Sequence, residues 1–479
     1  MKTQGFIIAF FLLSALQLHA QSERPNFIVI IGDDISWDDL GCYGHPTVKS
    51  PHVDKMATVG IKFTNTYLTA SSCSPSRCSI ISGRYPHNTG AAELHTPLPE
   101  GMPTLPGELK KSGYYTAAAG KWHLGSNVKS HFDLVVEKDN GNGGHKNWVK
   151  ALQERPKNQP FFMWFAAHDA HRIWHADDFG VPHDPNLSFV PPYLVDAEGT
   201  RQDLASYYNE IQRLDYYLGL VRDELKSQDV LNNTLIIYMA DNGRPFPRAK
   251  TRVYDSGMKT PFVLSWPKGQ KVFGAESNSL ISVIDIAPTF LELAEVKIGP
   301  TFQGISFASV IDNPEAEHRN YVFAEHNWHD YEAHERMVRT KHFMYVVNSR
   351  PQFPNQGPAD SNRSPSYEDL KSTRDSGILN HAQADVFSIP RPHEELFNCQ
   401  LDPDQLSNVA MNESYHDILN DLRFVMNEWI FETADNSPEN LTPSWYDSET
   451  GAKLDIEQIR GEMPGMKTNA VKNNNKGPF

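Results

Sequence analysis

Short apolar runs that end at polar residues recur along the first half of the chain. Each run is continuous, and Asp, Lys, His or Asn follows it within a few positions. Runs of this length without polar alternation are typical of strands that are buried on both faces of a parallel sheet. Four such strands are predicted, over residues 26–31, 115–119, 161–167 and 235–240.

Helical patterns lie between these runs. The clearest cover residues 51–59, 103–111, 205–228 and 284–294. Alternation of strands and helices predicts a doubly wound α/β domain. Ligands of such sheets bind beyond the carboxyl ends of the strands, so the polar residues that follow the four runs are expected to gather at one site.

The pattern changes after about residue 314. Short strands are predicted within residues 337–347, and the polar stretch 348–385 is expected to be rich in loops. Residues 418–432 have the pattern of an amphipathic helix, and the tail from Asn436 is expected to wrap the surface or to be partly disordered. We therefore predict a catalytic domain over residues 24–330 and a smaller domain over residues 331–479.

Composition narrows the possible functions. The chain has 479 residues and a formal net charge of −15, which argues against nucleic acid as a partner. Four cysteines are too few for a disulfide scaffold of this size, and no spacing identifies a pair. They are Cys42, Cys73, Cys78 and Cys399.

The first 20 residues have the pattern of a secretory signal. Lys2 precedes an apolar run over residues 6–16, and a short polar stretch ends at Ala20. The apolar run is too short to span a bilayer. We therefore expect a signal peptide over residues 1–20, export to the periplasm or the medium, and no membrane insertion after cleavage.

Cys73 lies at the start of a predicted helix. Ser74 can cap this helix, Pro75 suits its first turn, and Gly83 can end it. Free N–H groups at a helix start favour an anion, and Arg77 would return to the same face. The segment predicts an oxyanion site. Taken alone, however, a Cys near an Arg is more often a small buried residue beside an ion pair.

The segment Cys73-Ser74-Pro75-Ser76-Arg77 resembles the sulfatase signature Cys-x-Pro-Ser-Arg, which a maturation enzyme recognises. The resemblance implies an alkaline-phosphatase-like α/β sandwich, in which helices flank a large, mostly parallel sheet. It also implies a smaller C-terminal α+β domain with a short antiparallel sheet. Further motifs stand in the order of that family: Asp33-Asp34, Gly120-Lys121-Trp122-His123, His168 and Asp241-Asn242-Gly243.

The resemblance implies the chemistry of the site. The maturation enzyme would oxidise Cys73 to formylglycine, and one hydroxyl of the hydrated aldehyde would attack sulfur. Asp and Asn oxygens suit Ca²⁺ better than zinc. The predicted ligands of one calcium ion are Asp33, Asp34, residue 73, Asp241 and Asn242. The other predicted catalytic residues are Arg77, Lys121, His123, His168 and Lys250, while Arg244 and Arg248 remain alternatives to Lys250.

Two segments, residues 165–172 and 241–247, resemble the heparan N-sulfatase branch of the family. The expected activity is that of a sulfuric ester hydrolase on a sulfated polysaccharide, such as ulvan or a glycosaminoglycan, or on its oligosaccharides. Hydrolysis of N-sulfoglucosamine is the alternative within the family. A bacterial enzyme is favoured over a lysosomal one. The candidate sugar contacts are His87, His95, His171, Arg172 and His326.

Two readings from other classes remain open. A phosphomonoesterase or phosphodiesterase of the related superfamily would typically use Ser or Thr with two zinc ions. A sugar-binding relative without activity would have lost at least one member of the set, and none is missing here. Adjacent Asp residues and Asp-Asn-Gly are also common turn sequences, and a lone His after a strand is more often a hydrogen-bonded loop residue.

Overall fold

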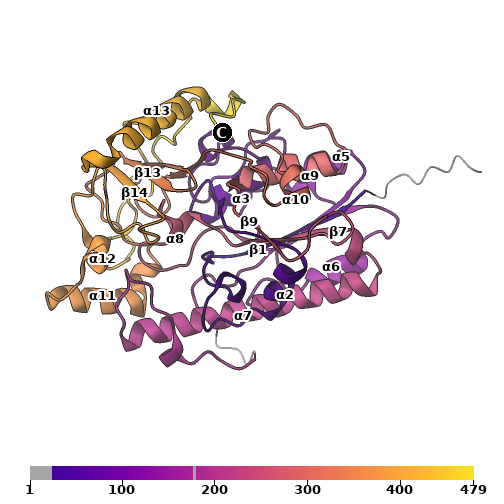
Figure 1. The fold of residues 1–479 in the computed structure, drawn as a ribbon, viewed down its shortest axis with the longest axis horizontal. Coiled ribbons are helices and arrows are strands. Elements are labelled where there is room, and N and C mark those ends of the chain that lie inside the picture. Colours follow the sequence, from indigo (N-terminus) through magenta and orange to yellow (C-terminus); the bar gives the residue numbers. More distant parts are fainter. Residues whose placement is uncertain (1–23, 176–179) are drawn as a thin grey trace, which may run out of the picture.

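The computed structural model describes residues 24–175 and 180–479 (Figure 1). The predicted signal peptide, residues 1–20, lies outside the described residues. Within the described ranges, no helix combines the length and the apolar character that crossing a lipid bilayer requires.

A mostly parallel sheet of eight strands forms the centre of the molecule, in the order β5-β4-β6-β1-β7-β8-β2-β9. Strand β1 runs parallel to its neighbours β6 and β7, and only β8 runs antiparallel to the strands on either side of it. The four predicted strands are confirmed to within one residue at each end. The strands are β1 (Asn26–Gly32), β2 (Ile61–Phe63), β4 (Tyr115–Gly120), β5 (Leu134–Val136), β6 (Phe161–Ala166), β7 (Thr234–Ala240), β8 (Phe262–Ser265) and β9 (Ala275–Ser277).

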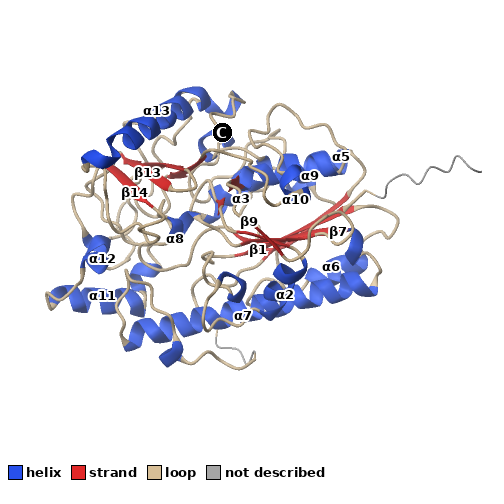
Figure 2. Cartoon of the chain, viewed as in Figure 1, coloured by secondary structure: helices blue, strands red, loops and turns tan. Residues whose placement is uncertain are grey.

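Helices cover both faces of this sheet (Figure 2). Ile28 and Ile30 of β1 belong to one apolar core, and Phe27, Val29 and Ile31 belong to another, because successive side chains of a strand point to opposite faces. On the first face lie α2 (Pro51–Val59), α6 (Trp148–Glu154) and α7 (Glu198–Ser227). On the second lie α3 (Cys73–Ser82), α5 (Leu105–Lys111), α9 (Ile286–Leu293) and α10 (Ala308–Asp312).

A second sheet contains four antiparallel strands, in the order β11-β12-β13-β14. Helix α13 (His416–Thr433) packs on it through Leu422 and Trp429. The expected boundary after residue 330 falls between the first two strands of this sheet. The predicted fold class is confirmed. The strands are β11 (Val322–His326), β12 (Glu335–Arg339), β13 (Phe343–Asn348) and β14 (Glu394–Asn398).

Two expectations need correction. The stretch 348–385 contains the helix α11 (Pro365–Asp375), whose residue Asp369 accepts hydrogen bonds from the backbone and side chain of Thr200. These hydrogen bonds hold the first turn of α7, so the helix begins at Glu198 rather than at the predicted residue 205. The remaining short elements are β3 (Thr66–Tyr67), β10 (Ile281–Ser282), α4 (Pro86–Thr89), α8 (Asp255–Met258) and α12 (His381–Ala384).

The tail from Asn436 packs against the body of the molecule. Arg84 donates hydrogen bonds to the carbonyl oxygens of Val471, at 3.1 Å, and of Asn473, at 2.7 Å. Ala470 is fully buried. The expectation that the tail wraps the surface is confirmed.

Candidate active site

The carboxyl ends of four parallel strands meet at one place. Asp33 and Asp34 follow β1, Asp241 and Asn242 follow β7, Lys121 follows β4 and His168 lies after β6. Backbone hydrogen bonds continue the sheet into this region: Asp241 N donates to Gly32 O at 3.1 Å, and Lys121 N donates to Ala166 O at 2.8 Å. The register of the sheet therefore places these side chains together.

Cys73 is the first residue of α3, and the residue before it, Ser72, is the N-cap. The expectation that Ser74 caps the helix is wrong: its Oγ accepts a hydrogen bond from His95 N at 2.7 Å. Gly83 ends the helix in a left-handed conformation with φ of 62°, as predicted. The helix start therefore points Cys73 at the strand ends.

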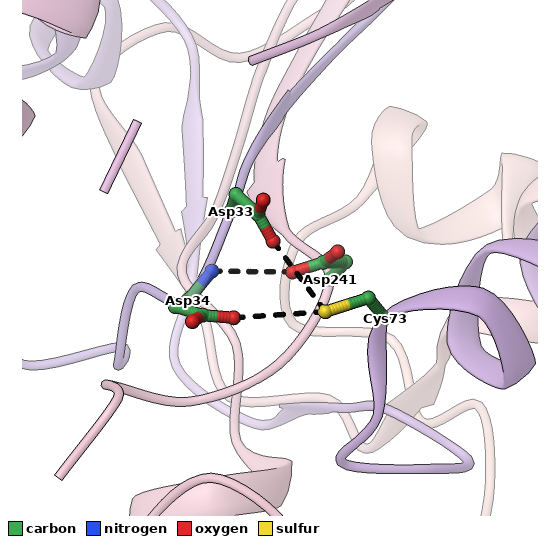
Figure 3. A group of neighbouring side chains, drawn as sticks. All are labelled: Asp33, Asp34, Cys73 and Asp241. Atoms are coloured by element: carbon green, nitrogen blue, oxygen red, sulfur yellow. Dashed lines mark hydrogen bonds between the residues drawn. The ribbon is translucent and has the colours of Figure 1, made fainter. Parts of the chain in front are cut away.

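Three carboxylates surround the Cys73 sulfur (Figure 3). Its Sγ atom lies 3.6 Å from Asp33 Oδ1 and 3.8 Å from Asp34 Oδ1. The backbone N–H of Asp34 donates to Asp241 Oδ1 at 3.2 Å. One ligand atom from each of the four residues lies within 4.8 Å of all the others, and all four residues are buried. The arrangement is compact enough to hold one ion.

Each carboxylate is also paired with a cation, so three negative groups face three positive groups. This balance permits six charged side chains to be buried together, since an unpaired buried charge is costly. The pairs are Arg77 Nε with Asp241 Oδ2 at 2.7 Å, Lys250 Nζ with Asp34 Oδ2 at 2.7 Å, and Lys121 Nζ with Asp33 Oδ2.

The buried charges shift the pKa values of the cluster in opposite directions. Burial and the neighbouring carboxylates raise the pKa of Asp34 to about 7. Burial also opposes ionisation of Asp33, but the adjacent cations, Lys121 first, hold its pKa well below the usual value. Burial raises the pKa of the Cys73 thiol, so the unmodified side chain is protonated at neutral pH and is a poor nucleophile.

The donor set fits a hard divalent cation. It consists of carboxylate and amide oxygens, the ligands that Ca²⁺ prefers. Asn242 Nδ2 donates to Asp34 Oδ1 at 2.6 Å, which turns the amide toward the carboxylates. Asn242 Oδ1 is buried and has no hydrogen-bond partner among the described residues. Beside three carboxylates, an acceptor without a partner is suited to bind a cation.

Two histidines lie beside the cluster. His123 has a positive φ of 48°, and its ring centroid lies 5.1 Å from that of His95. Burial and the nearby Lys121 lower the pKa of His123 to about 2. His168 is exposed, and partial burial lowers its pKa. Both rings are therefore neutral at neutral pH, so each has one nitrogen that can accept a proton and one N–H that can donate a hydrogen bond.

A pocket of about 650 Å³ opens above Cys73. It brings together most of the predicted residues outside the carboxylate cluster. Arg172 lines it, but both of its terminal nitrogens bind Asp203 at 2.7 Å, so its charge is already paired. The predicted residues that line the pocket are Cys73, His95, Lys121, His123, His168, His171 and Arg172.

Two candidate sugar contacts do not line this pocket, and their placement corrects the expectation. His87 is buried between Glu325 Oε1, at 2.5 Å, and Thr433 Oγ1, at 3.0 Å. His326 is buried and lies 3.1 Å from Glu335 Oε2. Glu325 is distant from His87 in the sequence, whereas Glu335 faces His326 across the β11–β12 pair.

The three late basic residues differ in their ion-pair partners. Arg244 is paired with Asp38, and Arg248 Nε binds Asp385 Oδ2 at 2.5 Å. Lys250 alone of the three contacts the carboxylate cluster. The backbone N–H of Thr251 donates to the backbone oxygen of Ser71 at 3.0 Å, which connects this segment to the start of α3.

Several residues that line the pocket have no counterpart in the sequence analysis. His329 follows β11, and its Nδ1 lies 2.7 Å from Ser72 Oγ, beside the nucleophile position. Four more of them come from the C-terminal part of the chain, whose polar composition gave no signal that they would turn toward Cys73. They are Asp330, Asp360, Arg363 and Tyr446.

Comparison with known families agrees with this geometry. The family model described as Sulfatase matches residues 25–296, more than half of the chain. The chain belongs to the sulfatase family. A second model, described as N-sulphoglucosamine sulphohydrolase, C-terminal, matches residues 248–349 of this sulfatase. As a family member, the chain is a hydrolase of sulfuric esters.

Two relatives align over most of the chain. An ulvan-active sulfatase from Formosa agariphila is 30% identical, over 89% of this chain and 79% of the relative. The human N-sulphoglucosamine sulphohydrolase is 29% identical, over 86% of this chain and 91% of its own length.

Solved structures share the fold. A protein in complex with its substrate D-glucosamine-2-N,6-O-disulfate superimposes with a TM-score of 0.66 and 19% identity, over 85% of this chain and 98% of that chain. The phosphonate monoester hydrolase of Agrobacterium radiobacter gives a TM-score of 0.61 and 17% identity, over 84% of this chain and 94% of that chain. At these identities, the likenesses show a shared fold, which does not by itself imply a shared function.

Proposed function

We propose that this sulfatase removes sulfate from a sulfated polysaccharide or its oligosaccharides after Cys73 has been oxidised to formylglycine. One observation carries the proposal: Cys73 lies at a helix start, 3.6 Å from Asp33 Oδ1, where three buried carboxylates and three buried cations meet. The maturation enzyme that recognises the Cys73 segment is the proposed partner in biosynthesis. We further propose that the mature enzyme acts in the periplasm or medium of a bacterium.

The charge balance explains how an anion is bound. Asp33, Asp34, Asp241, Asn242 and residue 73 would hold one Ca²⁺. When bound, this ion neutralises the carboxylates and polarises the oxygens that it touches. Because the carboxylates and cations already balance, an added divalent ion leaves the pocket floor positive, which favours the sulfate group.

The cations that pair with the carboxylates would then turn to the substrate. Arg77 offers a planar fork of N–H donors, and the Lys121 and Lys250 ammonium groups offer point charges that suit sulfate oxygens. Lys121 lines the pocket directly. Formylglycine, as its hydrate, supplies at residue 73 a hydroxyl that the protonated thiol cannot supply.

The histidines supply the proton transfers. Neutral His123 Nδ1, which is buried and has no hydrogen-bond partner among the described residues, can accept a proton from the hydroxyl of residue 73. His168 is exposed at the pocket, where it can take up a proton from solvent and, as the imidazolium, donate that proton to the leaving oxygen. The difference in exposure between the half-buried His123 and the exposed His168 supports this division of roles.

A carbohydrate substrate is supported by the pocket and by the relatives. About 650 Å³ lies within the range of sites for small ligands and has room for a sugar beyond the sulfate. The ulvan-active relative favours an O-sulfated sugar. The human relative and the matching C-terminal model favour N-sulfoglucosamine as the alternative substrate.

A phosphoesterase is the rival from another class. The metal cluster that the described residues form offers oxygen and one sulfur, and no imidazole belongs to it. That set suits calcium better than a pair of zinc ions. Metal analysis of the purified protein separates the two: one calcium per chain supports a sulfatase, and two zinc ions per chain would overturn it.

The main experiment has two readouts. Mass spectrometry of the peptide that carries Cys73 is expected to show an aldehyde in place of the thiol. Sulfate release is then measured on ulvan and heparan oligosaccharides, N-sulfoglucosamine, glucosamine 6-sulfate and 4-nitrophenyl sulfate. Activity that scales with the aldehyde fraction supports the proposal. Full activity in protein that retains the thiol would refute it.

A further inference from the structure

One wall of the pocket is built by the C-terminal part of the chain. Asp330 follows β11, and Asp360 and Arg363 lie in the loop before α11. All three line the same cavity as Cys73. We name these three residues the C-terminal wall. None of them belongs to the carboxylate cluster, so the wall faces the part of a substrate that lies beyond its sulfate.

The two carboxylates of the C-terminal wall are oriented by backbone donors. Ala359 N donates to Asp330 Oδ2 at 2.8 Å, and Ser361 N donates to Asp360 Oδ1 at 2.7 Å. Each side chain therefore has one oxygen held by the protein and one further oxygen available as an acceptor. The fixed orientation reduces the entropy lost when a ligand binds.

The nearest imidazoles do not hydrogen-bond to these carboxylates. His329 Nε2 lies 3.9 Å from Asp330 Oδ2, and His171 Nε2 lies 3.9 Å from Asp360 Oδ2. Both distances exceed the range of a hydrogen bond. The two carboxylates therefore keep their acceptor capacity on the pocket side.

Arg363 supplies donors on the same wall. Its side chain is exposed, and it makes no ion pair with another side chain of the described ranges. Arg374 is a useful contrast: it is on α11 and binds both carboxylate oxygens of Glu449, at 2.9 and 2.7 Å. The donors of Arg363 are therefore available to a ligand.

We propose that the C-terminal wall binds free hydroxyl groups of the sugar that carries the sulfate, and so selects a sugar sulfate over an aryl sulfate. This inference rests on the proposed function. A hydroxyl group donates and accepts at once, so it satisfies both a carboxylate and a guanidinium. A second anionic group fits less well, because two carboxylates accompany one guanidinium in the C-terminal wall.

Binding is measured in the full chain, loaded with calcium and made unreactive by Cys73→Ala. Calorimetry with glucosamine 6-sulfate, N-sulfoglucosamine and 4-nitrophenyl sulfate gives the ratio of sugar to aryl affinity. Arg363→Met and Asp360→Asn are each expected to lower this ratio about tenfold or more, since hydrogen bonds to charged groups are strong. Arg374→Gln, which removes a paired arginine, is the matched control and is expected to leave the ratio unchanged.

Deoxy analogues of the sugar that binds best identify the group that is recognised. Loss of the relevant hydroxyl is expected to weaken binding in the parent protein about tenfold and to have little effect in the Arg363→Met protein, because the same interaction is already lost. An unchanged ratio in both variants, or equal loss for sugar and aryl sulfates, would overturn the inference. So would a loss confined to sugars with a second anionic group.

The inference and the proposed function fail in different ways. Binding in the Cys73→Ala background does not depend on turnover or on formylglycine. A shifted affinity ratio together with absent sulfate release would support the wall and refute the catalytic proposal. Sulfate release with an unchanged ratio would support the catalytic proposal and refute the wall.

Discussion

Two buried charge networks in this sulfatase look alike in composition but differ in what they leave open. At the active site, Asp241 pairs with Arg77, yet Asn242 Oδ1 stays unsatisfied and Cys73 faces a pocket.

The C-terminal network is formed by His87, Glu325, Arg336 and Asp435. Within it, Arg336 binds Asp435 at 2.5 and 2.9 Å. His87 fills the space between Glu325 and Thr433, and none of the four lines the pocket.

The difference shows that burial of charge is a poor sign of function. A closed network satisfies its own donors and acceptors, and it specifies how two elements dock. A functional network keeps an acceptor or a cation for a ligand. His87 and His326 are among the predicted sugar contacts, but each is paired with a buried carboxylate.

The largest effect is expected from Cys73→Ala. Loss of the nucleophile should lower sulfate release by at least about 10⁴-fold, while the free energy of unfolding changes by about 1 kcal/mol or less because only one sulfur atom is lost. Sulfate release and urea unfolding measure the two quantities. Cys78→Ala is the matched control, since Cys78 is buried on the same helix but packs in the apolar core. The Cys78→Ala variant should keep its activity. Substantial turnover by the Cys73→Ala variant would count against residue 73 as the nucleophile.

A second test removes the open acceptor. Asn242→Ala should weaken calcium binding about a hundredfold and lower activity at limiting calcium, because ligands and their partners typically control affinity to this extent. Calorimetric titration with calcium measures the change. Asn355→Ala is the control: Asn355 is also buried with an unsatisfied Oδ1, but it contacts Tyr254 and Asp385 away from the cluster. Equal calcium affinity in the parent protein, the Asn242→Ala variant and the Asn355→Ala variant would contradict the proposed site.

The closed network should respond in stability rather than in activity. Asp435→Asn leaves Arg336 buried with only the more distant carboxylate of Glu325, at 3.8 Å, and should lower the free energy of unfolding by about 3 kcal/mol. Activity per folded molecule should stay within about twofold, since Arg336 does not line the pocket. Urea unfolding and sulfate release at low temperature separate the two. Lys467→Ala, which breaks an exposed pair with Glu462, should cost less than about 0.5 kcal/mol.

The smallest effect concerns pH. Arg319 holds the pKa of the buried Asp285 well below its usual value near 3.8, despite the opposing effect of burial. A lowered folded pKa stabilises the protein above the unfolded pKa, and this contribution is lost as the pH falls. The loss should begin below about pH 5 and reach about 1 kcal/mol at pH 3. Unfolding at several pH values measures it, and Asp285→Asn should flatten the decline. A decline of the same steepness in that variant would contradict the assignment.

Much of the fold followed from short-range pattern. Strands buried on both faces must be apolar throughout, so β1, β4, β6 and β7 stood out, and their polar ends predicted one site. The start of α7 was misplaced because its first turns are held by Asp369, which is distant in the sequence. The N-cap was misplaced by two residues because Ser72 and Ser74 are equally suited to cap a helix.

The sequence alone determined which residues follow each buried strand, and with them the cluster around Cys73. Local periodicity and strand order suffice for that, because parallel strands present their carboxyl ends at one edge. Only the tertiary structure decided which further polar groups reach the pocket. Asp360 and Arg363 come from a loop without periodicity, and His87 is taken up by Glu325. Such partners depend on long-range packing, on which local spacing has no bearing.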